Sequence, residues 1–140
     1  MDVYESHLKV TIAKIRALYP ELVEDCKPII PEMTKTQMRA VFDAFIDLRG
    51  SMPESNKENE ITLLVAVFAL FFDPDYLNGF KKKARVGFRP IISEFTGIKE
   101  RLLSYYFKQA LNQTVVRRFR DEVISTAKII SDLTGLDLEL

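Results

Sequence analysis

The sequence predicts an all-α protein, and two observations lead to this prediction. Apolar residues recur at intervals of three and four along almost the whole chain, which is the spacing of one face of an α-helix. No segment shows the sustained alternation of apolar and polar residues that is typical of a half-buried strand. The chain has 140 residues, the usual size of one domain. We therefore expect six or seven helices in a single compact multi-helix domain.

The first helix is expected over residues 2–18. Asp2 and Glu5 have the spacing of a capping box, in which two side chains satisfy backbone N–H groups at the start of a helix. The apolar face of this helix carries Tyr4, Leu8, Ile12, Ile15 and Leu18. Pro20 is expected to end it, and residues 20–33, which contain three prolines, are expected to be mostly loop with one helical turn at 21–26.

The second long helix is expected to begin at Thr34, because Thr34 and Gln37 form another capping-box pattern. Its apolar face carries Met38, Val41, Phe42, Phe45 and Ile46. The helix should end at Arg49–Gly50, since glycine readily takes the left-handed conformation that closes a helix. Residues 51–60 are polar and are expected to form a loop that could act as a hinge.

Residues 61–72 are apolar nearly all round, which predicts a helix buried at the centre of the fold. This run is shorter than the ~20 residues that a membrane span needs. Residues 65–72 are its only strand-like part, and the length and alanine content of the whole run favour a helix. Asp73 and Pro74 then predict the N-cap and first residue of a short helix that reaches about Phe80.

Two helices joined by a tight turn are expected between residues 89 and 112. Pro90 can open the first, because its missing N–H is not needed there. Gly97 suits a left-handed turn residue, and the second helix should run from about Lys99 to Asn112. It should bury one stripe, made of Leu102, Leu103, Tyr106 and Ala110. A last helix, capped by Thr114 and ended by Gly135, should bury Val116, Phe119, Val123, Ala127, Ile130 and Leu133.

Charge is distributed unevenly along a chain whose net charge is zero. Residues 81–120 carry 11 basic and 2 acidic side chains, a net charge of +9. The other parts are acidic: −3 over residues 1–60, −2 over 61–80 and −4 over 121–140. Such a concentration of positive charge creates a local field that attracts a polyanion.

The segment Ile92-Ser93-Glu94-Phe95-Thr96-Gly97-Ile98 resembles the common I-A-E-I-T-G-I pattern of helix-turn-helix DNA-binding proteins, such as bacterial and phage regulators, recombinases and sigma-like factors. The resemblance covers about residues 89–112. It departs from the pattern at Lys99, where Ser or Thr often caps the second helix. It implies that the second helix enters the major groove of DNA. The direct contacts would then come from Lys99, Arg101, Ser104, Tyr105 and Lys108.

Basic clusters flank this motif and are expected to hold backbone phosphates. These residues are Lys81, Lys82, Lys83, Arg85, Arg89, Arg117, Arg118 and Arg120. The cluster at 81–85 could instead be a solvated helix end, a nuclear-import signal or a patch for anionic lipid. The arginines at 117–120 could instead pair with Asp121 and Glu122 or lie in water.

Tyr106 is expected in the core. Tyr105 could lie either in the core or at the surface.

Several classes of function lack support in the sequence. No catalytic motif is present, and no cofactor, metal or small-molecule site can be identified. Cys26 is the one cysteine, so a disulfide within the chain and a paired-cysteine zinc site are excluded. A reducing compartment follows from this, and with no secretory signal at the N-terminus we expect a cytoplasmic protein without a membrane partner. His7 is the lone histidine and is expected to be exposed.

The sequence thus predicts a double-stranded DNA-binding protein that is not an enzyme: a transcriptional regulator, or an accessory factor of a phage or mobile element. Residues 1–60 would form a helical scaffold that could support a homodimer. Residues 61–140 would supply the core helix, the basic helix-turn-helix and the last helix, all within one domain. The alternative is a helical protein-interaction module whose basic face docks an acidic partner protein.

Overall fold

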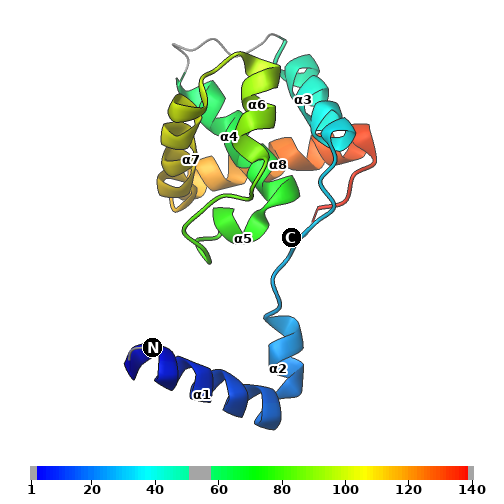
Figure 1. Cartoon of the computed structure of the whole chain (residues 1–140). Coiled ribbons are helices and arrows are strands. Elements are labelled where there is room, and N and C mark those ends of the chain that lie inside the picture. Colours follow the sequence, from blue (N-terminus) through cyan, green and yellow to red (C-terminus); the bar gives the residue numbers. More distant parts are fainter. Residues whose placement is uncertain (1–2, 51–57, 139–140) are drawn as a thin grey trace.

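Eight α-helices and no strand make up the part of the chain that the computed structural model describes, residues 3–50 and 58–138. The helices are α1 (Val3–Leu18), α2 (Pro20–Asp25), α3 (Lys35–Arg49), α4 (Glu58–Phe72), α5 (Pro74–Leu77), α6 (Phe88–Thr96), α7 (Glu100–Thr114) and α8 (Arg117–Thr134). The all-α prediction is confirmed, and the described residues form eight helices where six or seven were expected. Figure 1 shows α3 to α8 packed together, and we call this part the body.

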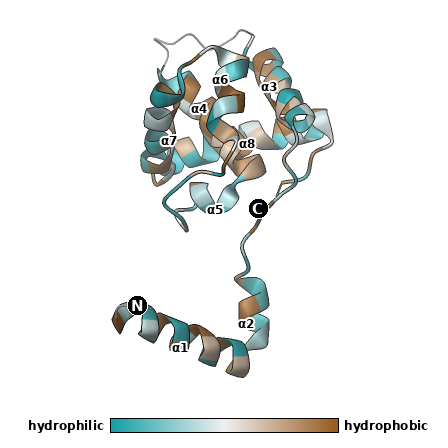
Figure 2. Cartoon of the chain, viewed as in Figure 1, coloured by the Kyte–Doolittle hydropathy of each residue, from teal (hydrophilic) through white to brown (hydrophobic). Residues whose placement is uncertain are grey.

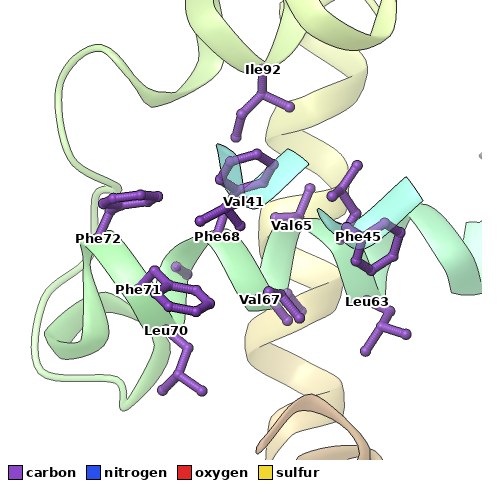
Figure 3. Packing of buried hydrophobic residues seen from close by; sticks show 14 of the residues in the cluster. Val41, Phe45, Leu63, Val65, Val67, Phe68, Leu70, Phe71, Phe72 and Ile92 are labelled. Carbon is purple, nitrogen blue, oxygen red and sulfur yellow. The ribbon is translucent and has the colours of Figure 1, made fainter. Parts of the chain in front are cut away.

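Helix α4 lies at the centre of the body, as its apolar composition predicts. Every residue from Ile61 to Phe72 is buried, and the helix contacts α3, α5, α7 and α8. Figure 3 shows the side chains of α4 surrounded by residues from other helices, including Val41 and Phe45 of α3 and Ile92 of α6. A helix without a polar side is stable only when neighbours cover it on all sides, so α4 organises the packing of the others.

The start of α3 follows the predicted capping box, while the start of α4 differs from the prediction. The hydroxyl of Thr34 accepts a hydrogen bond from the Gln37 N–H, and the Gln37 side chain accepts one from the Thr34 N–H. Helix α4 begins at Glu58, so residues 58–60 belong to it and not to the expected loop. The other loop residues, 51–57, and Asp2 of the first capping box lie outside the described residues.

Three boundaries in the second half of the chain differ from the predictions. Helix α5 ends at Leu77 and not near Phe80. Helix α6 begins at Phe88, so Pro90 is its third residue; proline is tolerated there because the N–H groups of the first turn have no partner within a helix. Thr114 is the last residue of α7 and not a cap of α8, since its hydroxyl donates to the carbonyl of Ala110.

Helix α8 buries a narrower face than predicted. Val123, Ala127 and Ile130 are buried as expected, and Thr126 joins them. Val116 and Leu133, at the two ends of the predicted face, are exposed. Helix α8 contacts α3, α4 and α7 through its buried face, while the apolar side chains of Val116 and Leu133 meet solvent.

Helix α1 does not join the scaffold that we expected residues 1–60 to form. Among the described residues, α1 and α2 contact no helix except each other, and neither contains a buried residue. Figure 1 shows both lying apart from the body, at the end of an extended segment. This segment contacts the body through the N–H of Ile29, which donates to Asp75 Oδ2 (2.9 Å), and the carbonyl of Pro31, which accepts from Arg85 (2.6 Å). In the described ranges no helix has both the length and the apolar content to cross a bilayer.

Candidate nucleic-acid interface

The helices α6 and α7 are joined by a three-residue turn that side chains hold in place. Gly97 takes the left-handed conformation (φ 75°), as its position predicts. The hydroxyl of Ser93 donates to the carbonyl of Ile98 (2.6 Å), and the hydroxyl of Thr96 accepts from the Ile98 N–H (3.1 Å). The Ile98 side chain is buried in the core. The turn between the two helices is therefore held by hydrogen bonds on one side and by core packing on the other.

Helix α7 presents one buried side and one exposed side. The buried side carries Leu103, Tyr106, Phe107, Ala110 and Thr114. Tyr106 is 4% exposed and Tyr105 45% exposed, so the first is a core residue, as predicted, and the second faces solvent. Leu102, which we expected in the buried stripe, is 43% exposed, and Phe107 takes its place because it packs against Tyr76 and Phe88.

Four of the five predicted contact residues are exposed, and three of these share one side of α7. Lys99, Arg101, Tyr105 and Lys108 are all exposed. Arg101, Tyr105 and Lys108 follow one another at intervals of four and three residues, which places them along one side of the helix. Lys99 immediately precedes α7, and its side chain makes no capping hydrogen bond, as expected for a lysine at this position.

Basic residues from three parts of the chain meet in a surface hollow of about 300 Å³. It is lined by Lys82, Lys83, Arg89, Ser104 and Lys108, together with Tyr76, Ala84, Phe107 and Leu111. Lys82 and Lys83 come from the loop between α5 and α6, Arg89 from α6 and Lys108 from α7. No carboxylate is among these lining residues. We call this site the basic hollow.

The Arg89 side chain is held in position by Ser104. Arg89 Nη1 donates a hydrogen bond to Ser104 Oγ (2.7 Å), and the Ser104 hydroxyl lies 3.3 Å from the carbonyl of Glu100. Ser104, predicted as a direct contact, is thus placed to orient an arginine. Sequence reasoning missed this pairing because the two residues lie on different helices, 15 positions apart, and no local pattern connects them.

Charge from Arg89 acts on Tyr76, which also lines the basic hollow. Burial raises the pKa of the Tyr76 phenol, the carboxylate of Asp73 raises this pKa further, and the positive charge of Arg89 partly opposes both effects. The guanidinium of Arg89 therefore lies close enough to the aromatic lining of the basic hollow to influence its titration.

Two of the predicted phosphate contacts hold the 81–85 loop against the body. Arg85 Nη1 donates to the carbonyls of Pro31 (2.6 Å) and Phe72 (3.0 Å), so this guanidinium is engaged with backbone. Lys81 Nζ forms an ion pair with the buried carboxylate of Asp73 (2.8 Å). These two residues support the loop that carries Lys82 and Lys83, and neither lines the basic hollow.

The basic cluster at the start of α8 is not part of the basic hollow. Arg117, Arg118 and Arg120 are exposed, and Arg117 lies 3.8 Å from the carboxylate of Asp121. Arg120 lines a separate hollow of about 300 Å³ that includes Lys128 and apolar residues of α4, α5 and α8. The two flanking clusters thus contribute to different parts of the surface.

Comparison with protein-family models, with curated protein sequences and with solved structures gives no match to this chain.

Proposed function

We propose that the chain binds double-stranded DNA through the exposed side of α7 and the adjacent basic hollow, as a transcriptional regulator or as an accessory factor of a phage or mobile element. The observation that carries the proposal is the convergence of Lys82, Lys83, Arg89 and Lys108 beside that exposed side, with no carboxylate in the lining. Phosphate contacts provide most of the affinity for DNA, and contacts to base edges provide the sequence preference.

The dimensions of the exposed side suit the major groove. An α-helix fits into this groove, which is about 12 Å wide. The interval from Arg101 to Lys108 corresponds to about 10 Å along the helix axis, at roughly 1.5 Å per residue. Arg101 and Tyr105 offer donors to base edges, and Lys108 lies where this side meets the basic hollow. One helix thus supplies the base contacts and one wall of the phosphate site.

Binding to a fluorescently labelled random duplex, followed by anisotropy at a series of salt concentrations, tests the proposal. The four cations of the basic hollow should release counterions, so that log K falls with log salt with a slope of about −3 to −4. An absence of binding at ~50 mM salt, where phosphate contacts dominate, would refute DNA binding.

Two substitutions should separate base contacts from phosphate contacts. Arg101→Ala should relax the preference for selected over random duplexes by about 1–3 kcal/mol, because it removes a contact to base edges. Lys82→Ala should weaken all duplexes about equally, because it removes a phosphate contact. Duplexes selected from a random pool, and then measured by anisotropy, give both quantities.

Lys9→Ala is the matched control, since Lys9 is an exposed cation on α1 and therefore outside the body. It should leave affinity and preference unchanged. Equal effects of Arg101→Ala and Lys82→Ala on preference would contradict the orientation proposed for α7. The alternative, an acidic protein partner, predicts retention on heparin that duplex DNA does not displace.

A further inference from the structure

We infer that the basic hollow is a binding site for a single phosphate group, and we call this site the phosphate seat. The inference builds on the proposed function by assigning the hollow a ligand: in a DNA complex it would take one backbone phosphate. The residues that line the hollow would bind the phosphate group of a small molecule equally well.

The charge of the hollow selects an anion. Lys82, Lys83, Arg89 and Lys108 surround a space of about 300 Å³. The nearby carboxylate of Asp73 is already engaged, since Oδ1 pairs with Lys81 and Oδ2 accepts from the backbone N–H of Arg85 (2.8 Å). The carboxylate of Asp73 therefore does not neutralise the cations that line the hollow. An oxyanion can pair with these cations.

Arg89 is the group that distinguishes a phosphate seat from a diffuse basic patch. Arginine has five N–H donors in a planar fork that matches two oxygens of a phosphate. The bond from Nη1 to Ser104 fixes the guanidinium and leaves other donors for the ligand. A side chain held in this way loses less conformational entropy on binding than a free lysine does.

The aromatic wall of the hollow strengthens its electrostatic attraction. The rings of Tyr76 and Phe107 meet edge to face with centroids 5.9 Å apart, and Phe107 stacks on the buried Phe88 at 5.7 Å. A packed apolar surface excludes water from one side of the ligand, so each charge is screened less than at an open surface. The volume of about 300 Å³ lies at the lower limit for small-ligand sites, which suits a single phosphate group.

The test is an NMR titration of the full chain with inorganic phosphate, with sodium chloride at equal ionic strength as the reference titration. We expect saturable shifts of the Arg89 side-chain and Ser104 backbone N–H signals with phosphate, and none with chloride. Arg89→Lys should weaken phosphate binding at least about fivefold, because lysine cannot form the fork-shaped contact. Lys82→Ala, in an exposed loop, should weaken it as well and provides a second variant should Arg89→Lys disturb the fold.

Ser104 is tested as a positioning residue. Ser104→Ala should weaken phosphate binding about two- to threefold, and Ser104→Thr, which keeps the hydroxyl, should restore it. Lys14→Ala removes an exposed cation on α1 that does not line the hollow, and it should have no effect. A loss with Lys14→Ala equal to that with Arg89→Lys would overturn the inference, because charge alone would then explain binding.

Duplex DNA added to the phosphate complex identifies the source of the phosphate. Displacement of phosphate from Arg89 by the duplex would identify a backbone phosphate as the ligand. Saturable phosphate binding by a chain that does not bind duplex DNA would support the seat, with a phosphorylated small molecule as its ligand, and would refute the proposed function. Duplex binding that Arg89→Lys does not weaken, with no saturable phosphate shift, would refute the seat and leave the proposed function standing.

Discussion

Asp73 shows how much of the candidate site depends on one buried carboxylate. It precedes α5 as the sequence predicts, yet its side chain makes no capping hydrogen bond to that helix. Its two oxygens contact Lys81 Nζ and the Arg85 N–H instead. The Arg85 side chain in turn donates hydrogen bonds to the carbonyls of Phe72 and Pro31. This residue therefore anchors the loop that brings Lys82 and Lys83 to α7.

Tyr76 should make the stability of the protein sensitive to alkaline pH. Burial and the charge of Asp73 raise the pKa of its phenol above the ordinary value of 10.0. A raised pKa in the folded state gives a contribution to stability that is complete below pH 10 and is lost as the pH rises through the folded-state pKa. Tyr76→Phe removes this titration, so the variant should lose less unfolding free energy between about pH 8 and about pH 11 than the unmodified chain.

Urea unfolding at several pH values measures this difference. Tyr19→Phe serves as the control, because Tyr19 is exposed and lies between α1 and α2, which contact no helix of the body, and the substitution should leave the pH curve of the body unchanged. Parallel pH curves for Tyr76→Phe and the unmodified chain would show that the Tyr76 phenol does not contribute.

At the level of elements, the turn between α6 and α7 sets the position of α7. Gly97 has φ 75°, and a Cβ built there would meet no atom within 4 Å beyond those of its two chain neighbours. The cost of Gly97→Ala therefore comes from the backbone alone and should be about 1–2 kcal/mol of unfolding free energy. Urea denaturation measures it.

Gly97→Asn is the matched comparison, since asparagine tolerates the left-handed region better than alanine does. It should cost less than Gly97→Ala. Equal stability of Gly97→Ala and the unmodified chain would mean that the turn adopts another conformation in solution.

At the scale of the whole molecule, the exposed apolar face of α1 suggests a contact with a second copy of the chain. Tyr4, Leu8, Ile12 and Leu18 are all exposed, and Figure 2 shows hydrophobic and hydrophilic residues alternating along this helix. Glu5 lies in the first turn of α1 and Arg16 in the last. An antiparallel pair of α1 helices would cover both apolar faces and place these opposite charges near each other, so we propose that α1 mediates a homodimer.

Leu8→Asp should shift the chain to a monomer in sedimentation experiments at micromolar concentrations, because it places a charge in the proposed contact. The melting temperature of the body should not change directly, since α2 is the one described helix that α1 contacts. Ala13→Asp adds the same charge on the opposite side of α1 and should leave the dimer intact. A monomeric unmodified chain at high micromolar concentration, with and without DNA, would refute the dimer.

The helices and the central position of α4 could be predicted from local patterns, because helix formation and burial depend on residues within a few turns of one another. The capping box at Thr34, the left-handed turn at Gly97 and the apolar run at 61–72 are of this kind, and the structure confirms each of them. The helical period also predicted the exposed side of α7, apart from Leu102. This residue was expected in the core and is exposed, whereas Phe107 is buried.

The amino-acid sequence by itself determined the all-α class, most helices and the concentration of basic residues, since these follow from composition and spacing along the chain. Only the tertiary structure decided which basic residues meet: Lys82, Lys83, Arg89 and Lys108 share a hollow, Arg85 is engaged by backbone carbonyls, and the cluster at 117–120 lies elsewhere. It also decided that α1 lies apart from the body. The physical reason is that these outcomes depend on contacts between residues far apart in sequence, such as Arg89 with Ser104 and Asp73 with Lys81, which no local pattern encodes.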